Sequence, residues 1–224
     1  MSRLFGSSET DYFNDRFDAG RRLASMIADK GISDNVLVLG LPRGGVPVAY
    51  EVARKLKAPL DIWLVRKLGV PGHEELAMGA LASGGTRVVN EDIVRSMEVA
   101  KEDFDKVIAR ETSEIERREK TYRGDKPMPE IKGRTVIVVD DGLATGASMK
   151  AALRSLSVHN PARIIAAVPV GAPDTCRLLS RDASEVICMR QPRFMDAVGR
   201  WYLNFEQTTD EEVRELLERA EAEE

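Results

Sequence analysis

Cysteine and histidine are scarce in this chain of 224 residues. Its two cysteines, Cys176 and Cys188, form no C-x-x-C pair, and its two histidines stand far apart in the sequence. These counts argue against a disulfide scaffold, a zinc site and a histidine-based metal cluster or catalytic triad. They are typical of a reducing compartment, so we expect a cytoplasmic location. Both cysteines lie in apolar surroundings and are predicted to pack as small hydrophobic side chains.

Long apolar runs and a strong charge of one sign are also missing. No run approaches the ~20 apolar residues that span a bilayer, and the first ten residues lack the apolar core of a signal peptide. We therefore expect no membrane partner. The formal net charge is −4, which argues against a broad nucleic-acid-binding surface. Charged residues make up 31% and hydrophobic residues 43%, a balance typical of globular proteins.

Apolar segments and amphipathic helical segments alternate through most of the chain. The alternation predicts an α/β fold whose doubly wound, mainly parallel sheet is flanked by helices. Ligands of such sheets bind at the carboxyl ends of the strands. We expect a single domain over residues 1–224, with a core of about 15–190 and a C-terminal tail of about 190–224. Predicted strands cover residues 36–40, 60–66, 136–139, 163–170 and 185–189, and predicted helices cover 15–30, 47–56, 147–157 and 174–180.

The remaining segments are less regular. Residues 67–75 contain two glycines and a proline and predict a mobile loop. Residues 91–122 predict one or two charged helices with a partial apolar stripe, whose outer side faces solvent or a second copy in a homodimer. Residues 1–14 are expected to form an extended arm or a short strand. Thr209 and Glu212 form a capping box that opens a last helix.

The most informative motif is the segment 135–148, T-V-I-V-V-D-D-G-L-A-T-G-A-S. A buried strand ends in two acids, Asp140 and Asp141, and a glycine-containing turn then leads into a helix that begins near Ala147. The turn and the helix N-terminus offer backbone N–H groups to a phosphate. The two carboxylates only accept hydrogen bonds, which suits a sugar diol or a hydrated cation. The motif therefore predicts a sugar phosphate site; the alternative is an ordinary strand–loop–helix junction with two solvated acids.

This motif resembles the phosphoribosyl pyrophosphate (PRPP) motif of type I phosphoribosyltransferases. In that family the acid pair binds the ribose hydroxyls and the turn binds the 5′-phosphate. A Walker A loop is excluded, because no lysine follows the second glycine. The resemblance implies that Asp140 and Asp141 bind ribose and, through ribose or water, Mg²⁺. It also implies a 5′-phosphate site made by Gly142, Leu143, Ala144, Thr145, Gly146, Ala147 and Ser148.

A second motif, Pro42-Arg43-Gly44-Gly45, follows the first predicted core strand. Glycines let the backbone approach a pyrophosphate closely, and an arginine offers two donors in a fork. The motif resembles the pyrophosphate loop of the same family. Arg43, Gly44 and Gly45 are therefore expected to hold pyrophosphate, and a plain turn is the alternative.

A third segment, R-K-L-G-V-P-G, begins at Arg66. It resembles the segment that enters the flexible loop of adenine-type phosphoribosyltransferases. Arg66 and Lys67 would then sit on a lid that closes over pyrophosphate and excludes water. His73, Glu74 or Glu75 of the same loop would carry a proton to the accepting nitrogen. The alternative for a lone loop histidine is a solvated side chain.

The acceptor is not given by these motifs. Ala144 stands where 6-oxopurine enzymes usually carry an acid, which weakens hypoxanthine, guanine and xanthine as acceptors and is closer to the adenine pattern. The aromatic tail, with Phe194 and Trp201, is expected either to form a small hood that stacks on the acceptor or to bury the last helix. Most of the chain, including this tail, resembles uncharacterised bacterial phosphoribosyltransferase-domain proteins.

The resemblance implies a Mg²⁺-dependent phosphoribosyltransferase of nucleotide metabolism and nucleoside salvage. It would transfer the 5-phosphoribosyl group from PRPP to a nitrogenous base and release pyrophosphate. Asp140, Asp141, Lys67 and Arg43 would carry the catalysis. Two alternatives stay open: a PRPP-sensing regulator without turnover, and a pyrophosphokinase, which needs a nucleotide site that the motifs do not supply.

Overall fold

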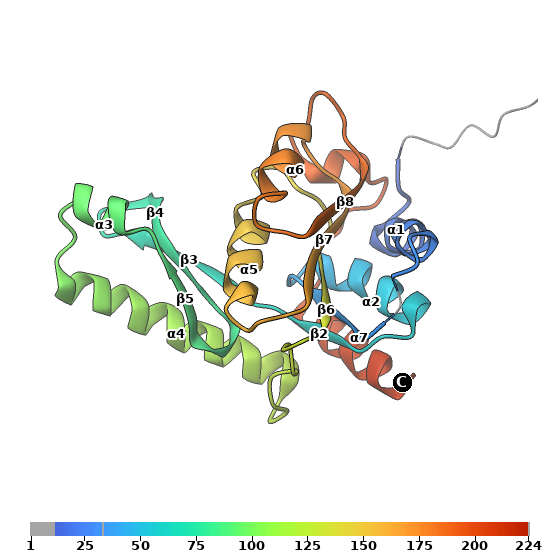
Figure 1. Ribbon diagram of the computed structural model, residues 1–224, viewed down its shortest axis with the longest axis horizontal. Coiled ribbons are helices and arrows are strands. Elements are labelled where there is room, and N and C mark those ends of the chain that lie inside the picture. The colour runs from blue at the N-terminus through green and yellow to red at the C-terminus, as the bar shows by residue number, and fades with distance from the viewer. Residues whose placement is uncertain (1–11, 33, 224) are drawn as a thin grey trace, which may run out of the picture.

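The computed structural model describes residues 12–32 and 34–223, so the arm expected over 1–14 lies mostly outside the described residues. The centre of the fold is a five-stranded sheet in the order β2-β1-β6-β7-β8, and every neighbouring pair is parallel. Figure 1 shows helices on both sides of it. The predicted α/β fold with a parallel sheet is confirmed. The strands are β1 (Val36–Gly40), β2 (Leu60–Ile62), β6 (Thr135–Val139), β7 (Arg163–Val170) and β8 (Glu185–Arg190).

Alternate residues of the central strands face two separate hydrophobic layers. In β6, Val136 and Val138 pack with α5 (Ala147–Ser157) and α6 (Pro173–Leu179), whereas Ile137 and Val139 pack with α1 (Arg16–Asp29) and α2 (Gly45–Leu56). Burial on both faces explains why these strands are continuous apolar runs in the sequence. Cys176 and Cys188 belong to the first layer, as their apolar surroundings predicted.

A second, antiparallel sheet of three strands extends to the left of the parallel sheet in Figure 1. It contains β3 (Val65–Val70), β4 (His73–Ala82) and β5 (Thr86–Val89). The predicted strand 60–66 is therefore confirmed at residues 60–62, which form β2, and wrong beyond them, where the chain turns into the second sheet. The chain leaves the parallel sheet at Trp63, and the backbone N–H of Leu64 donates to Ser83 Oγ at 3.0 Å.

The predicted mobile loop over residues 67–75 is also wrong, because most of this segment lies in the β3–β4 hairpin. Leu68 and Val70 bury their side chains in a third hydrophobic cluster. Gly69 fits because the strands approach closely: a Cβ there would lie 2.7 Å from the Glu74 carbonyl oxygen. Tertiary burial outweighs the loop character of the two glycines and the proline.

The charged region 91–122 forms two helices, α3 (Glu91–Ser96) and α4 (Lys101–Arg123). The apolar side of α4 packs on the antiparallel sheet and on α7 (Asp210–Ala222), through side chains that include Ile115 and Leu216. At the end of α4, Arg123 Nε donates to Asp61 Oδ1 at 2.8 Å, and Arg123 Nη2 donates to the Ile62 carbonyl at 2.8 Å. These bonds tie the helix that supports the antiparallel sheet to β2 of the parallel sheet.

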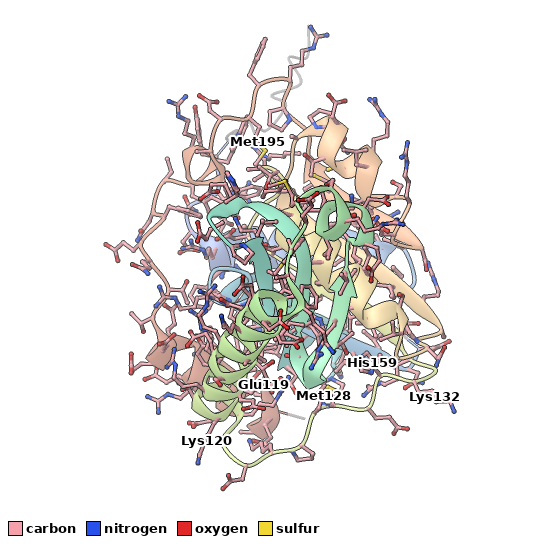
Figure 2. All side chains as sticks on the ribbon, turned by 90° about the vertical axis from the view of Figure 1, so that its left-hand side faces the viewer. Glu119, Lys120, Met128, Lys132, His159 and Met195 are labelled. Carbon is pink, nitrogen blue, oxygen red and sulfur yellow. The ribbon has the colours of Figure 1, made fainter. Side chains whose placement is uncertain are left out.

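Two side-chain hydrogen bonds connect the antiparallel sheet, and the segment that leads into it, to the C-terminal end of α5. The Trp63 indole N–H donates to Ser155 Oγ at 2.9 Å, and Thr86 Oγ1 lies 2.9 Å from His159 Nε2. Figure 2 looks onto the antiparallel sheet and α4, with His159 near the lower end and Met195 of the tail at the upper end. The sheet is thus fastened to the C-terminal end of α5.

The aromatic tail packs against the N-terminal part of the chain. Tyr202 pairs with Phe13 in a parallel bridge, and their rings lie 5.4 Å apart. The last helix instead buries Val213 and Leu216. The interpretation that the tail aromatics bury this helix is therefore wrong. None of the helices in the described part of the chain combines the length and apolarity that a bilayer crossing needs.

Candidate functional site

The acid pair follows β6, in the middle of the parallel sheet. Asp140 Oδ1 accepts a hydrogen bond of 2.9 Å from the backbone N–H of Asp141. Burial, together with the neighbouring Asp141 charge, raises the pKa of Asp140 well above its usual value. Burial also raises the pKa of Asp141, although Arg16 opposes this shift. Two largely buried carboxyl groups are poised for a ligand whose hydroxyls or positive charge would take the place of solvent.

The loop 41–46 packs directly on the acid pair, which explains its glycines. The carboxyl ends of β1 and β6 are neighbours, so the loops after them meet. A Cβ on Gly44 would lie 2.1 Å from Asp141 Oδ2, and a Cβ on Gly45 would lie 2.6 Å from the Val139 carbonyl oxygen. Neither position has room for a side chain. The peptide bond between Pro42 and Arg43 is cis.

The turn 142–148 leads into α5 with an unusual N-cap. Gly146 has a φ of 68°, which favours glycine, and no side chain caps the helix. Thr145 Oγ1 accepts only a long hydrogen bond of 3.5 Å from the backbone N–H of Ala147. The first N–H groups of α5 therefore remain available for an anion, as a phosphate-binding helix N-terminus requires.

Contacts from two other elements, α6 and the end of β7, hold this turn, and sequence reasoning missed them. Thr175 of α6 donates a hydrogen bond of 2.8 Å from Oγ1 to the Ala144 carbonyl. Leu143 pairs with Gly171 in a parallel bridge, and its backbone N–H donates to the Val170 carbonyl at 2.9 Å. These contacts fix the turn relative to β7. The sequence carries no local signal for them, because the partners lie about thirty residues away.

A cavity of about 610 Å³ separates α5 from the antiparallel sheet. It brings together the first turn of α5, through Ala147 and Ser148, and Lys67 of β3. The end of the predicted 5′-phosphate turn and Lys67 thus line one space. The floor is apolar, with small side chains from β4 and β5 such as Ala80 and Val88.

Comparison with known proteins shows the family of this chain. The family model of the phosphoribosyl transferase domain matches residues 73–199. The chain belongs to the phosphoribosyl transferase domain family. The match includes Asp140, Asp141 and the turn 142–148, and it begins after the loop 41–46 and Lys67. The resemblance to type I phosphoribosyltransferases is thereby confirmed.

Two curated proteins of Mycobacterium tuberculosis, from strains CDC 1551 / Oshkosh and H37Rv, carry the name "Putative phosphoribosyl transferase". Each is 45% identical to this chain over 208 residues, which is 93% of this chain and 47% of the relative. The chain thus spans about half the length of the curated relatives it matches. The solved structure of TT1426 from Thermus thermophilus is 43% identical, with a TM-score of 0.82, and the alignment covers 92% of this chain and 97% of that one.

The cations predicted for this phosphoribosyltransferase domain have other partners in the structure. Arg43 lies 3.7 Å from Asp210 and Lys67 lies 3.6 Å from Glu75, in half-exposed or exposed pairs that cost little to separate. Arg66 instead bonds at 2.8 Å to Glu111, which is buried. Among the described residues, the cation that contacts the acid pair is Arg16, which sequence reasoning did not select.

The predicted proton carriers and hood residues lie mostly at the surface. His73, Glu74 and Glu75 are all exposed at the start of β4, beside the tip of the hairpin. The Phe194 side chain is 87% exposed, so it is free to contact a ligand. The half-buried Trp201 ring stacks on Tyr12 at 6.3 Å. The roles of these residues stay predictions.

Proposed function

We propose that this protein transfers the 5-phosphoribosyl group of PRPP to a nitrogenous base and releases pyrophosphate, in cytoplasmic nucleotide salvage. The observation that carries the proposal is the adjacency of three parts at one sheet edge. The acid pair lies against the glycine loop 41–46, and the turn 142–148 follows it directly and ends at an open helix N-terminus. These parts suit the diol, the pyrophosphate and the 5′-phosphate of one PRPP molecule.

The mechanism depends on positioning and charge. As pyrophosphate leaves, the ribose gains positive charge, and the carboxylates of Asp140 and Asp141 stabilise that charge and hold the hydroxyls. Arg43 turns from Asp210 to the departing pyrophosphate. This movement costs little, because the half-exposed ion pair between Arg43 and Asp210, at 3.7 Å, is weak. Lys67 approaches from the hairpin. The Phe194 ring, on the tail, is the proposed contact for the base.

Magnesium is proposed as the cofactor. The described residues include no group of three His, Cys, Asp or Glu side chains that could hold a metal ion. Two neighbouring carboxylates nevertheless fit a hard cation that carries most of its ligands with it. Asp140 and Asp141 would hold Mg²⁺ through ribose or water. When bound with PRPP, the ion supplies charge neutralisation for the pyrophosphate oxygens.

The test is product formation from PRPP labelled in the ribose, offered with Mg²⁺ and a panel of purine and pyrimidine bases. A labelled nucleotide with one base, and pyrophosphate in equal amount, is the expected result. PRPP binding without product from any base would favour the sensing regulator. Formation of PRPP and AMP from ribose 5-phosphate and ATP, in a parallel assay, would favour the pyrophosphokinase. Absence of PRPP binding would overturn the proposal.

Lys67→Ala is expected to lower turnover about tenfold while the PRPP dissociation constant changes less than about twofold, because a cation that meets the pyrophosphate mainly as it departs acts on the transition state. The lysine is half-exposed and pairs only weakly, with the exposed Glu75 at 3.6 Å. Single-turnover rates and PRPP titrations measure the two effects separately. Lys106→Ala is the control, because Lys106 is an exposed lysine on α4 paired with Asp103. Equal kinetics in the variant and the parent would refute the role of Lys67.

A further inference from the structure

Arg16, the first residue of α1, contacts both loops of the candidate site. Its Nε donates a hydrogen bond of 2.8 Å to Asp141 Oδ2. A Cβ placed on Gly44 would lie 3.2 Å from the same Nε. The arginine side chain is 11% exposed, so its charge is largely removed from water. A guanidinium group in this position lies beside the acid pair and the pyrophosphate loop at once.

The C-terminal tail holds this guanidinium in place. Arg16 Nη1 donates to the Glu206 carbonyl at 2.6 Å, and the Phe205 ring centroid lies 3.8 Å from Arg16 Cζ. The same tail also holds Asp141, because the Tyr202 hydroxyl donates to its backbone carbonyl at 2.6 Å. Both partners of the ion pair are thus fixed by residues 202–206. A planar guanidinium that is stacked and hydrogen-bonded loses little further freedom when a ligand arrives.

An ion pair that merely fastens α1 to the sheet is the competing interpretation. Two observations favour a role toward the ligand. The pair stands at the carboxyl ends of the strands, where the loops of the site meet, and its carboxylate is one of the two predicted to bind ribose. Its Nε bond goes to one carboxylate oxygen, and a carboxylate has lone pairs for further donors. Arg16 can therefore orient Asp141 without blocking it.

We propose that Arg16 is a positioning residue for PRPP, which orients the Asp141 carboxylate toward the ribose hydroxyls and adds a fixed positive charge beside the pyrophosphate loop. The proposal rests on the proposed function, because it assumes that PRPP occupies this site. It also gives the tail a second role. Residues 202–206 act as the support of the acid pair, whichever base the exposed Phe194 contacts.

The test compares Arg16→Gln, Arg16→Lys and Arg22→Gln in PRPP titration calorimetry with Mg²⁺. Arg22 is the matched control: it lies on the same helix, pairs with Asp18 and faces the Phe13 ring at 5.5 Å. Arg16→Gln is expected to weaken PRPP binding about tenfold, the effect of one charge-assisted hydrogen bond. The PRPP affinity of Arg16→Lys should lie between those of Arg16→Gln and the parent, because an ammonium group keeps the positive charge but lacks the forked donors of a guanidinium group. Arg22→Gln should stay within about twofold of the parent, since the partners of Arg22, Asp18 and the Phe13 ring, lie outside the acid pair and the loop 41–46.

Chemical rescue separates positioning from fastening. Millimolar guanidinium ion should restore part of the PRPP affinity of Arg16→Ala and none of that of Asp141→Asn, because only the first variant leaves a cation-shaped gap beside an intact carboxylate. If Arg16→Ala does not fold, Phe205→Leu serves as the second variant, because it removes the ring that stacks on Arg16 and keeps the ion pair. Its PRPP affinity is expected to be about threefold weaker than that of the parent, the effect of one cation–π contact.

Two negative results have different meanings. If the parent binds PRPP and a folded Arg16→Gln variant binds it equally well, the role of Arg16 is overturned and the proposed function stands. If the parent binds no PRPP, the proposed function is overturned and the role of Arg16 with it.

Discussion

Replacing Asp140 and Asp141 together by asparagine is expected to weaken PRPP binding by about 100-fold or more, since two charge-assisted hydrogen bonds to ribose hydroxyls, each contributing about 1.5 kcal/mol, are lost. The amides keep the size of the side chains and remove both charges. Titration calorimetry with PRPP and Mg²⁺ measures the change. Asp174→Asn is the control, because Asp174 is an exposed aspartate of α6 in an ion pair with Arg177. Unchanged affinity in the double variant would refute the assignment of the ribose site.

The stability of the single variant Asp140→Asn shows whether a loss of PRPP binding comes from a loss of folding. Folding raises the pKa of Asp140, so the folded chain holds this proton more tightly than the unfolded chain. The protonated Asp140 side chain therefore contributes to the free energy of unfolding at low pH. This contribution is lost as the pH rises above about 3.9, the pKa of an aspartate in the unfolded chain. Asp140→Asn should therefore be at least as stable as the parent at pH 7, with the difference vanishing below about pH 4. Thermal unfolding at both pH values tests this sign.

Gly44→Ala is expected to cost about 1–3 kcal/mol of stability, because an added methyl group overpacks a filled space. The new Cβ would lie 2.1 Å from Asp141 Oδ2, so the carboxylate must move away from the position that Arg16 holds. Because the carboxylate that is predicted to bind ribose is displaced, PRPP binding should weaken about 30-fold. This is more than the loss of one hydrogen bond alone would cause. Urea unfolding and PRPP titration measure the two effects.

The control for this prediction is Gly72→Ala at the turn of the β3–β4 hairpin. Nothing lies within 4 Å of a Cβ there, but the backbone φ of +77° disfavours a side chain. Gly72→Ala should therefore cost about 1 kcal/mol through backbone strain and leave PRPP affinity unchanged. If Gly44→Ala lowered stability and kept full PRPP affinity, the contact between the two loops would be structural only.

Much of the candidate site could be predicted because its parts are local in sequence. The acid pair, the turn and the start of α5 follow one another within 135–148, and each has a recognisable residue preference. The central strands could be predicted for a related reason: β1 and β6 are buried on both faces, so nearly every residue in them is apolar. The N-cap Thr209 is similarly local, and its side chain accepts a hydrogen bond from the backbone N–H of Glu212 as expected.

The errors and omissions share a cause, which is distance along the chain. The end of β2 at Ile62 and the hairpin that follows depend on burial against α4 and α7, which lie far along the sequence. Arg16 meets Asp141 across 125 residues, and the need for glycine at position 44 arises only where two loops meet. Sequence periodicity reports the face that a segment buries, and it carries no record of the partner.

By itself, the sequence of this protein determined the parallel α/β class, the boundaries of β1, β6, β7 and β8 to within one residue, and the motif of the acid pair and its turn. Tertiary structure alone decided which cation faces the acids, that the segment after β2 forms a second sheet, and that the aromatic tail supports the site. The physical reason is that strands, turns and caps are specified by neighbouring residues. The charge and shape of the site arise from side chains that only the fold brings together.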